Sequence, residues 1–207
     1  DSTDFLRDEF VNINLIHEKN KYELTNNSEA NKRVLQEIIK NPVNQIFYIT
    51  GEKGNAKSMA LLVLALTCDE LNIYYPKYSK AKKIISEFKD LGNYIKNQID
   101  EKNKLKEHSA KELFLFIDDF DELEESERKS IETSLSLIDQ SIFIFLTSEK
   151  DYRFNKQNVI KMDIAPPQST EENKLPASWI KTFQELYFCR KSNFKADSRY
   201  SFYNHYL

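Results

Sequence analysis

Glycine is scarce in this sequence: only three of its 207 residues are glycine. Cysteine is equally rare, and its two residues lie far apart without metal-ligand spacing, which indicates buried thiols in a reducing cytosol rather than a disulfide framework. No apolar run approaches the roughly 18 residues that a membrane-spanning helix needs. The sequence also opens without a signal-peptide pattern. We therefore expect a cytoplasmic protein that makes no membrane contact.

The sequence also lacks a large excess of charge of either sign. Lysine and arginine number 30, aspartate and glutamate 33, and the formal net charge is −3. No global field favours DNA, so we expect no direct binding of nucleic acid. The three histidines are far apart and form no cluster suited to catalysis. An apolar fraction of 40% over this length is enough for one sizeable domain with its own hydrophobic core.

Short apolar segments alternate with helical patterns along the chain. The expected strands are 46–50, 72–75, 112–117, 141–146 and 159–164. The expected helices are 30–40, 57–71, 80–106 and 126–138, followed by a further helix around Trp179. Pro76 is expected to end the second strand, and Gly92 to bend the long helix. This alternation predicts a three-layer α/β fold with a parallel central sheet.

The segment Gly51–Ser58, Gly-Glu-Lys-Gly-Asn-Ala-Lys-Ser, follows an expected strand and opens an expected helix. Glycine tolerates the positive φ that turns backbone N–H groups inward around a phosphate. Lys57 would then reach the β- and γ-phosphates, and Ser58 would ligate Mg²⁺ beside the partial positive charge of the helix N-terminus. We therefore predict a site for ATP or ADP with Mg²⁺. The alternative is an ordinary strand–turn–helix connection.

The residues expected to contact the nucleotide form one continuous stretch. They are Gly51, Glu52, Lys53, Gly54, Asn55, Ala56, Lys57, Ser58 and Met59. Ala56 stands where the G-x-x-x-x-G-K-[ST] pattern has its second glycine. Its methyl group would cost roughly 1 kcal/mol or more if the backbone there is strained. We expect hydrolysis to suffer from this departure more than binding.

Acidic residues follow the third expected strand. In a parallel sheet the carboxyl ends of the strands lie together at one edge, beside the glycine loop. We assign Asp118 to Mg²⁺, together with Ser58. Asp119 or Glu122 would orient or activate the attacking water, and Thr147, after the next strand, would polarise that water or contact the γ-phosphate. The alternative is a solvated acidic turn that caps the next helix.

The order of these motifs resembles the AAA+ module of the bacterial replication initiator DnaA and of its shorter relative Hda. The similarity runs from about Tyr22 to Phe188. It is carried by Tyr22–Asn31, Gly51–Ser58, Ile73–Tyr75, Leu115–Asp119, Leu146–Glu149 and Ile164–Pro167. It implies an ATP/ADP-responsive regulator of DNA replication initiation that contacts another AAA+ subunit or a second copy of itself. Hydrolysis would be weak or would depend on a partner's arginine, for which Arg153 is the nearest candidate in this chain.

The same resemblance implies how the chain is divided. Residues 1–21 would form an N-terminal arm, 22–168 the P-loop NTPase domain, and 169–207 a C-terminal helical extension or partial lid. Asn27 and Ala30 lie in the stretch that would approach the adenine. A full helical lid with its own arginine sensor has no match in the sequence.

Two further interpretations stay open. The segment Asp118–Leu123 and the pair Thr147–Ser148 also resemble NACHT-type signalling NTPases, which belong to a different functional class and carry further helical and sensor domains. The third interpretation is a degenerate P-loop fold that serves as a protein-interaction scaffold without nucleotide turnover.

Overall fold

In the part of the chain that the structure describes, the strands form a seven-stranded sheet with the order β2-β1-β7-β3-β6-β5-β4. The computed structural model describes residues 12–25, 27–40, 45–105, 108, 111–135, 142–154 and 159–165. The strands are β1 (Ile13–His17), β2 (Asn20–Leu24), β3 (Ile46–Thr50), β4 (Tyr74–Lys80), β5 (Glu112–Asp118), β6 (Ile142–Ser148) and β7 (Val159–Ile164). The helices are α2 (Ser28–Ile38), α3 (Lys57–Leu71), α4 (Ala81–Phe88), α5 (Leu91–Lys104), the 3₁₀ turn η1 (Phe120–Glu122) and α6 (Glu125–Leu135).

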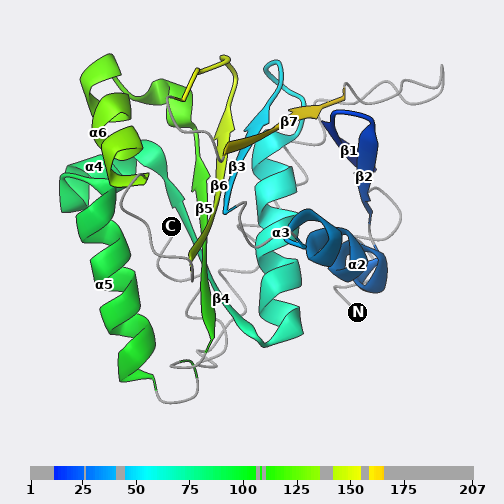
Figure 1. Ribbon diagram of the computed structural model, residues 1–207, viewed down its shortest axis with the longest axis horizontal. Helices are drawn as coiled ribbons and strands as arrows, with labels where there is room; N and C mark the ends of the chain where they lie inside the picture. The colour runs from blue at the N-terminus through cyan, green and yellow to red at the C-terminus, as the bar shows by residue number, and fades with distance from the viewer. Residues whose placement is uncertain are drawn as a thin grey trace, which may run out of the picture. The chain divides into compact units, whose positions relative to one another are not determined.

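Helices cover both faces of this sheet. Figure 1 shows α3 and α2 on one side and α4, α5 and α6 on the other. The middle strands β3 and β6 are buried at every position, and β5 at every position after Glu112. Strands covered on both faces need continuous apolar sequence, which explains why these segments are apolar runs rather than alternating ones. The predicted three-layer α/β architecture is confirmed.

The central strands run parallel, from β7 through β3, β6 and β5 to β4. Strand β6 lies between β3 and β5, with Thr50 opposite Ser148 and Ile117 opposite Leu146. The carboxyl ends of these three strands therefore meet at one edge of the sheet. That edge is where ligands bind in open parallel sheets.

An N-terminal hairpin extends the sheet beyond β7. Strand β1 pairs antiparallel with both β2 and β7, so residues 13–24 belong to the sheet. The sheet thus begins earlier than the sequence indicated, since we assigned residues 1–21 to an arm. The hairpin turns at Glu18, which has a positive φ of 53°. The turn lacks the Asn-Gly or Asp-Gly pair that usually marks a hairpin in a sequence, and this explains why the strands were missed.

Two expected boundaries differ from the structure. Strand β4 does not end at Pro76 but continues to Lys80, because β4 is the last strand of the sheet and a proline on an edge strand loses no necessary hydrogen bond. The expected long helix is two helices that separate at Lys89, which has a φ of 71°, and Asp90, which caps α5 by accepting from Asn93 N. Gly92 lies in the first turn of α5 rather than at the bend.

One expected part of the chain cannot be compared with the structure. The C-terminal extension, 169–207, and its expected helix around Trp179 lie outside the described residues. Within the described ranges, no helix has the length and apolar character needed to cross a bilayer.

Candidate functional site

The glycine loop joins β3 to α3 and contains two glycines with different roles. A Cβ atom on Gly51 would lie 3.3 Å from Cβ of Ile164, a tight contact that would require the end of β7 to shift by a few tenths of an ångström. Gly54 has space for a side chain, but its φ of +88° is one that other residues rarely adopt. The first glycine therefore allows close packing, and the second allows the turn of the backbone.

Ala56 lies directly before α3 in a left-handed conformation, with φ 58° and ψ 28°. A residue with a Cβ pays roughly 1–2 kcal/mol for this conformation. Among the described residues, no side chain caps the N-terminus of α3 or that of α4, whereas Asn27 caps α2 and Asp90 caps α5. The first N–H groups of α3 therefore remain available to an anion, which the helix dipole also favours.

Lys57 places its positive charge over the glycine loop. Its Nζ donates hydrogen bonds to the carbonyl oxygens of Gly51 and Glu52, each at 2.8 Å. The hydroxyl of Ser58 lies in the first turn of α3, on an exposed residue. Positive charge, free backbone N–H groups and a hydroxyl are thus brought together in one short segment. This donor set fits a nucleotide phosphate chain.

The carboxylate of Asp118 is held from both neighbouring strands. Asp118 ends β5 and is only 2% exposed. On one side, the hydroxyl of Thr147 on β6 donates a short hydrogen bond to Oδ1. On the other side, the hydroxyl of Tyr78 on β4 donates to Oδ2 at 2.6 Å. Short hydroxyl–carboxylate bonds of this kind are charge-assisted and fix the orientation of the carboxylate.

Asp119 is oriented differently from its neighbour. Its backbone is left-handed, with φ 57°, and its N–H donates to Oγ1 of Thr147 at 3.2 Å. Its Oδ2 accepts from Nζ of Lys80 on β4 at 2.7 Å. The hydrogen bond to Asp119 is the main cause that raises the pKa of Lys80 above its usual value, so this lysine stays charged. Thr147 therefore contacts both acidic residues.

The turn after β5 holds the other acidic candidates. Glu122 ends η1 and is exposed. Asp121, which belongs to the segment that resembles NACHT-type NTPases, accepts a hydrogen bond from the N–H of Glu149 at 2.8 Å and so joins this turn to the end of β6. Asp118, Asp119 and Thr147 thus form one bonded group, while the side chain of Glu122 lies at the exposed end of the turn.

The described residues suit Mg²⁺ only if a phosphate shares the site. They contain no group of three or more histidine, cysteine, aspartate or glutamate residues that could hold a metal ion. Mg²⁺ is commonly bound by one or two carboxylates together with substrate phosphates and water. A single buried carboxylate at Asp118 and the hydroxyl of Ser58 agree with that mode. Both supply the hard oxygen donors that this ion prefers.

The sequence did not reveal Tyr78 and Lys80 as members of the site. Both lie in the part of β4 that follows Pro76, and Lys80 belongs to a basic segment that is typical of a solvated helix face. Only the register of β4 against β5 identifies them, because the two strands pair in parallel and bring Lys80 opposite Asp118.

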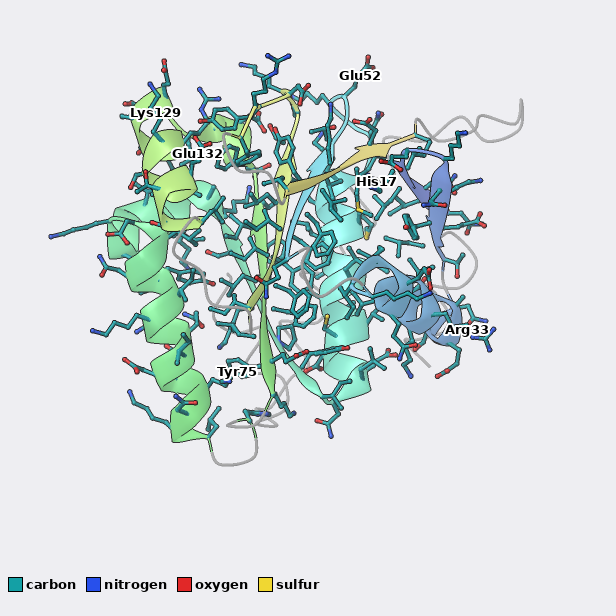
Figure 2. The ribbon with its side chains drawn as sticks, in the orientation of Figure 1. His17, Arg33, Glu52, Tyr75, Lys129 and Glu132 are labelled. Carbon is teal, nitrogen blue, oxygen red and sulfur yellow. The ribbon has the colours of Figure 1, made fainter. Side chains whose placement is uncertain are left out.

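The expected adenine-contacting stretch lies away from the glycine loop. Ser28 donates a short hydrogen bond to Glu70, and Lys32 lies 3.7 Å from the same carboxylate. Glu70 is near the C-terminal end of α3, about 20 Å from Lys57 at a rise of 1.5 Å per residue. Figure 2 shows Glu52 of the glycine loop at the top of the view and Arg33 of α2 well below it. The assignment of Asn27 and Ala30 to the base is therefore wrong.

Comparison with known proteins gives a distant structural likeness. The solved structure of C. elegans PCH-2 is similar to this chain, with a TM-score of 0.42 and 18% sequence identity. The match covers 68% of this chain and 40% of the PCH-2 chain, so the chain spans less than half of that protein. No protein-family model and no curated protein matches the sequence. The three-layer α/β fold with its largely parallel sheet is assigned from this chain's own strands and helices.

Proposed function

We propose that this chain is a nucleotide-binding module of the AAA+ P-loop type, which holds ATP or ADP with Mg²⁺ and changes its protein contacts with the nucleotide state. One observation carries the proposal: the uncapped N-terminus of α3 follows the left-handed Ala56, with the ammonium of Lys57 folded over the loop. This arrangement lies at the same edge of the sheet as the buried Asp118.

Each residue of the proposed site has a separate role in binding the nucleotide. The N–H groups between Gly51 and Met59 donate to phosphate oxygens, and Lys57 exchanges its two carbonyl partners for phosphate. Ser58 would supply a hydroxyl ligand for Mg²⁺, and Asp118 would help to hold the ion through water. Mg²⁺, when bound, neutralises charge on the phosphates. Affinity then depends chiefly on Lys57 and on the backbone of the loop.

Hydrolysis is slow in this proposal because the carboxylate of Asp119 is already engaged by Lys80. Its Oδ2 lies 2.7 Å from Nζ of Lys80, so this oxygen is less free to accept a hydrogen bond from an attacking water. Glu122 is the second candidate for this role, from its exposed place on η1. Arg153 is exposed between the half-buried Tyr152 and Phe154, which suits an arginine that acts on a partner's nucleotide.

The narrower assignment is regulation of DNA replication initiation, through contact with another AAA+ subunit or a second copy of this chain in the cytoplasm. It rests on the sequence resemblance to DnaA and Hda. In this assignment the nucleotide state changes the surface that the partner contacts. A purely scaffolding role predicts, by contrast, equal partner binding with and without nucleotide.

A second candidate function is that of a NACHT-type signalling NTPase. The observation that favours it is the hydrogen bond from the N–H of Glu149 to Asp121, which connects the NACHT-like segment Asp118–Leu123 to the end of β6. In that class of protein, further domains would respond to nucleotide exchange. The two candidates share the nucleotide site and differ in the partner, so partner identification separates them.

The experiment that tests nucleotide binding is identification of the nucleotide that copurifies with the protein. Purified protein is denatured, and the released small molecules are separated by chromatography. We expect ADP or ATP from the wild type and from Lys129→Ala, which changes an exposed lysine on α6. We expect little or none from Lys57→Ala. Equal recovery of nucleotide from Lys57→Ala and wild type would contradict the proposed role of Lys57.

A further inference from the structure

We propose that Tyr78 is a positioning residue for Mg²⁺, which acts by fixing the carboxylate of Asp118. This inference rests on the proposed nucleotide site. The hydroxyl of Tyr78 lies 2.6 Å from Asp118 Oδ2, and the same carboxylate takes its second hydroxyl bond from Thr147. The two donors come from β4 and β6, which flank β5 on its two sides. The carboxylate is therefore held between them and cannot rotate without breaking a bond.

The register of β4 explains why a tyrosine can do this. Lys80 is the residue directly opposite Asp118, whereas Tyr78 is opposite Phe116, further back along the strands. A side chain at position 78 must therefore reach forward to the sheet edge, and the length of a phenol ring is suited to that reach. The nearer residue, Lys80, is directed to Asp119 instead. Strand β4 thus gives each of the two acidic residues its own partner.

Asp118 can accept further hydrogen bonds besides those from the two hydroxyl groups. An ionised carboxylate has about four acceptor positions, and two of them are used by Tyr78 and Thr147. The remaining positions can accept from water molecules that surround a bound Mg²⁺. Since Mg²⁺ demands near-ideal octahedral geometry and keeps several waters, the orientation of that carboxylate decides how well the shell fits. Partners of this kind commonly change metal affinity 10- to 100-fold when removed.

Replacement of Tyr78 by phenylalanine isolates this effect, because the ring stays and only one oxygen is lost. The affinity for ATP is measured by calorimetry over a series of Mg²⁺ concentrations, and also in EDTA. We expect Tyr78→Phe to raise the Mg²⁺ concentration needed for half of the metal-dependent gain in affinity by about tenfold. We expect affinity in EDTA to equal that of the wild type. A purely structural role of the phenol would lower both affinities together.

Tyr152→Phe is the matched control, because it also removes a phenol that donates to a carboxylate, that of Glu132 at 3.1 Å. It should keep the wild-type Mg²⁺ dependence. If Tyr78→Phe has wild-type or tighter Mg²⁺ dependence, the positioning role is overturned while the nucleotide site stands. If the wild type itself shows no Mg²⁺-dependent binding of ATP, the proposed metal site and the role of Tyr78 are both overturned.

Discussion

Nζ of Lys80 lies 2.7 Å from Oδ2 of Asp119, so our first candidate for activating water is already paired with a cation of the same chain. The pair connects the last residue of β4 with the residue that follows β5. The lysine is exposed and the aspartate only partly so. Exposed ion pairs contribute about 0–1 kcal/mol to stability. The main consequence of this pair is therefore that it engages the carboxylate of Asp119, not that it stabilises the fold.

Removal of this cation should free Oδ2 of Asp119 to accept a hydrogen bond from the attacking water. We predict that Lys80→Ala raises the rate constant for ATP hydrolysis by up to roughly tenfold, below the roughly 10²–10⁴-fold that a well-positioned base supplies. The melting temperature should stay close to that of the wild type. Phosphate release under saturating ATP and Mg²⁺ measures the rate constant. The double variant Lys80→Ala with Asp119→Asn should lose the gain.

Lys82→Ala is the control for this prediction. Lys82 pairs with Glu127 at 2.9 Å, so its removal also breaks an ion pair. Its partner lies on α6 rather than in the acidic turn, and the hydrolysis rate should not change. A fall in rate for Lys80→Ala would show instead that the lysine assists the reaction, which contradicts our assignment.

Ala56 should be a weak point of the folded chain. Glycine adopts the left-handed conformation without the roughly 1–2 kcal/mol cost that alanine pays, although glycine loses more entropy on folding, by about 0.5–1 kcal/mol. We predict that Ala56→Gly raises the free energy of unfolding by about 0.5–1 kcal/mol. Urea unfolding monitored by circular dichroism measures the change.

The opposite result is expected where alanine is helical. Ala30 lies in α2, at the other end of α3 from the loop, so Ala30→Gly should destabilise the protein and leave nucleotide affinity unchanged. If Ala56→Gly destabilised the protein as Ala30→Gly does, the left-handed conformation of Ala56 would not lower the free energy of unfolding, which would contradict this prediction.

Tyr48 should make stability fall at alkaline pH. Burial is the main cause that raises the pKa of Tyr48 to about 12, whereas tyrosine in an unfolded chain titrates near pH ~10. Between these two values the unfolded chain releases a proton that the native protein keeps, so the free energy of unfolding falls as pH rises. We predict that Tyr48→Phe removes this part of the decline.

The phenylalanine variant also loses the hydrogen bond from Tyr48 to the carbonyl oxygen of Lys150, at 2.6 Å. At neutral pH this loss should cost about 1 kcal/mol. Urea unfolding at pH 7 to 11 separates the two effects, because only one of them depends on pH. A constant difference between the two proteins over the whole range would contradict the raised pKa of Tyr48.

The sequence predicted the elements that carry the glycine loop. Strand β3, helix α3 and strand β7 have the bounds that we expected, since each has clear end signals in the sequence. Pro76 was misleading because local propensity does not tell an edge strand from an interior one. The hairpin before α2 has no turn signature, and the place of Ser28 depends on its contact with Glu70, 42 residues later. Long-range pairing also decides the roles of Tyr78 and Lys80, and no local pattern contains it.

The most direct test of the account is the affinity of the folded protein for ADP and ATP with Mg²⁺, measured by calorimetry on protein stripped of bound nucleotide. We expect micromolar dissociation constants for the wild type and at least tenfold weaker binding for Lys57→Ala, which loses a charge-assisted contact of about 1.5–3 kcal/mol. No heat with either nucleotide, from protein shown to be folded by circular dichroism, would contradict the account.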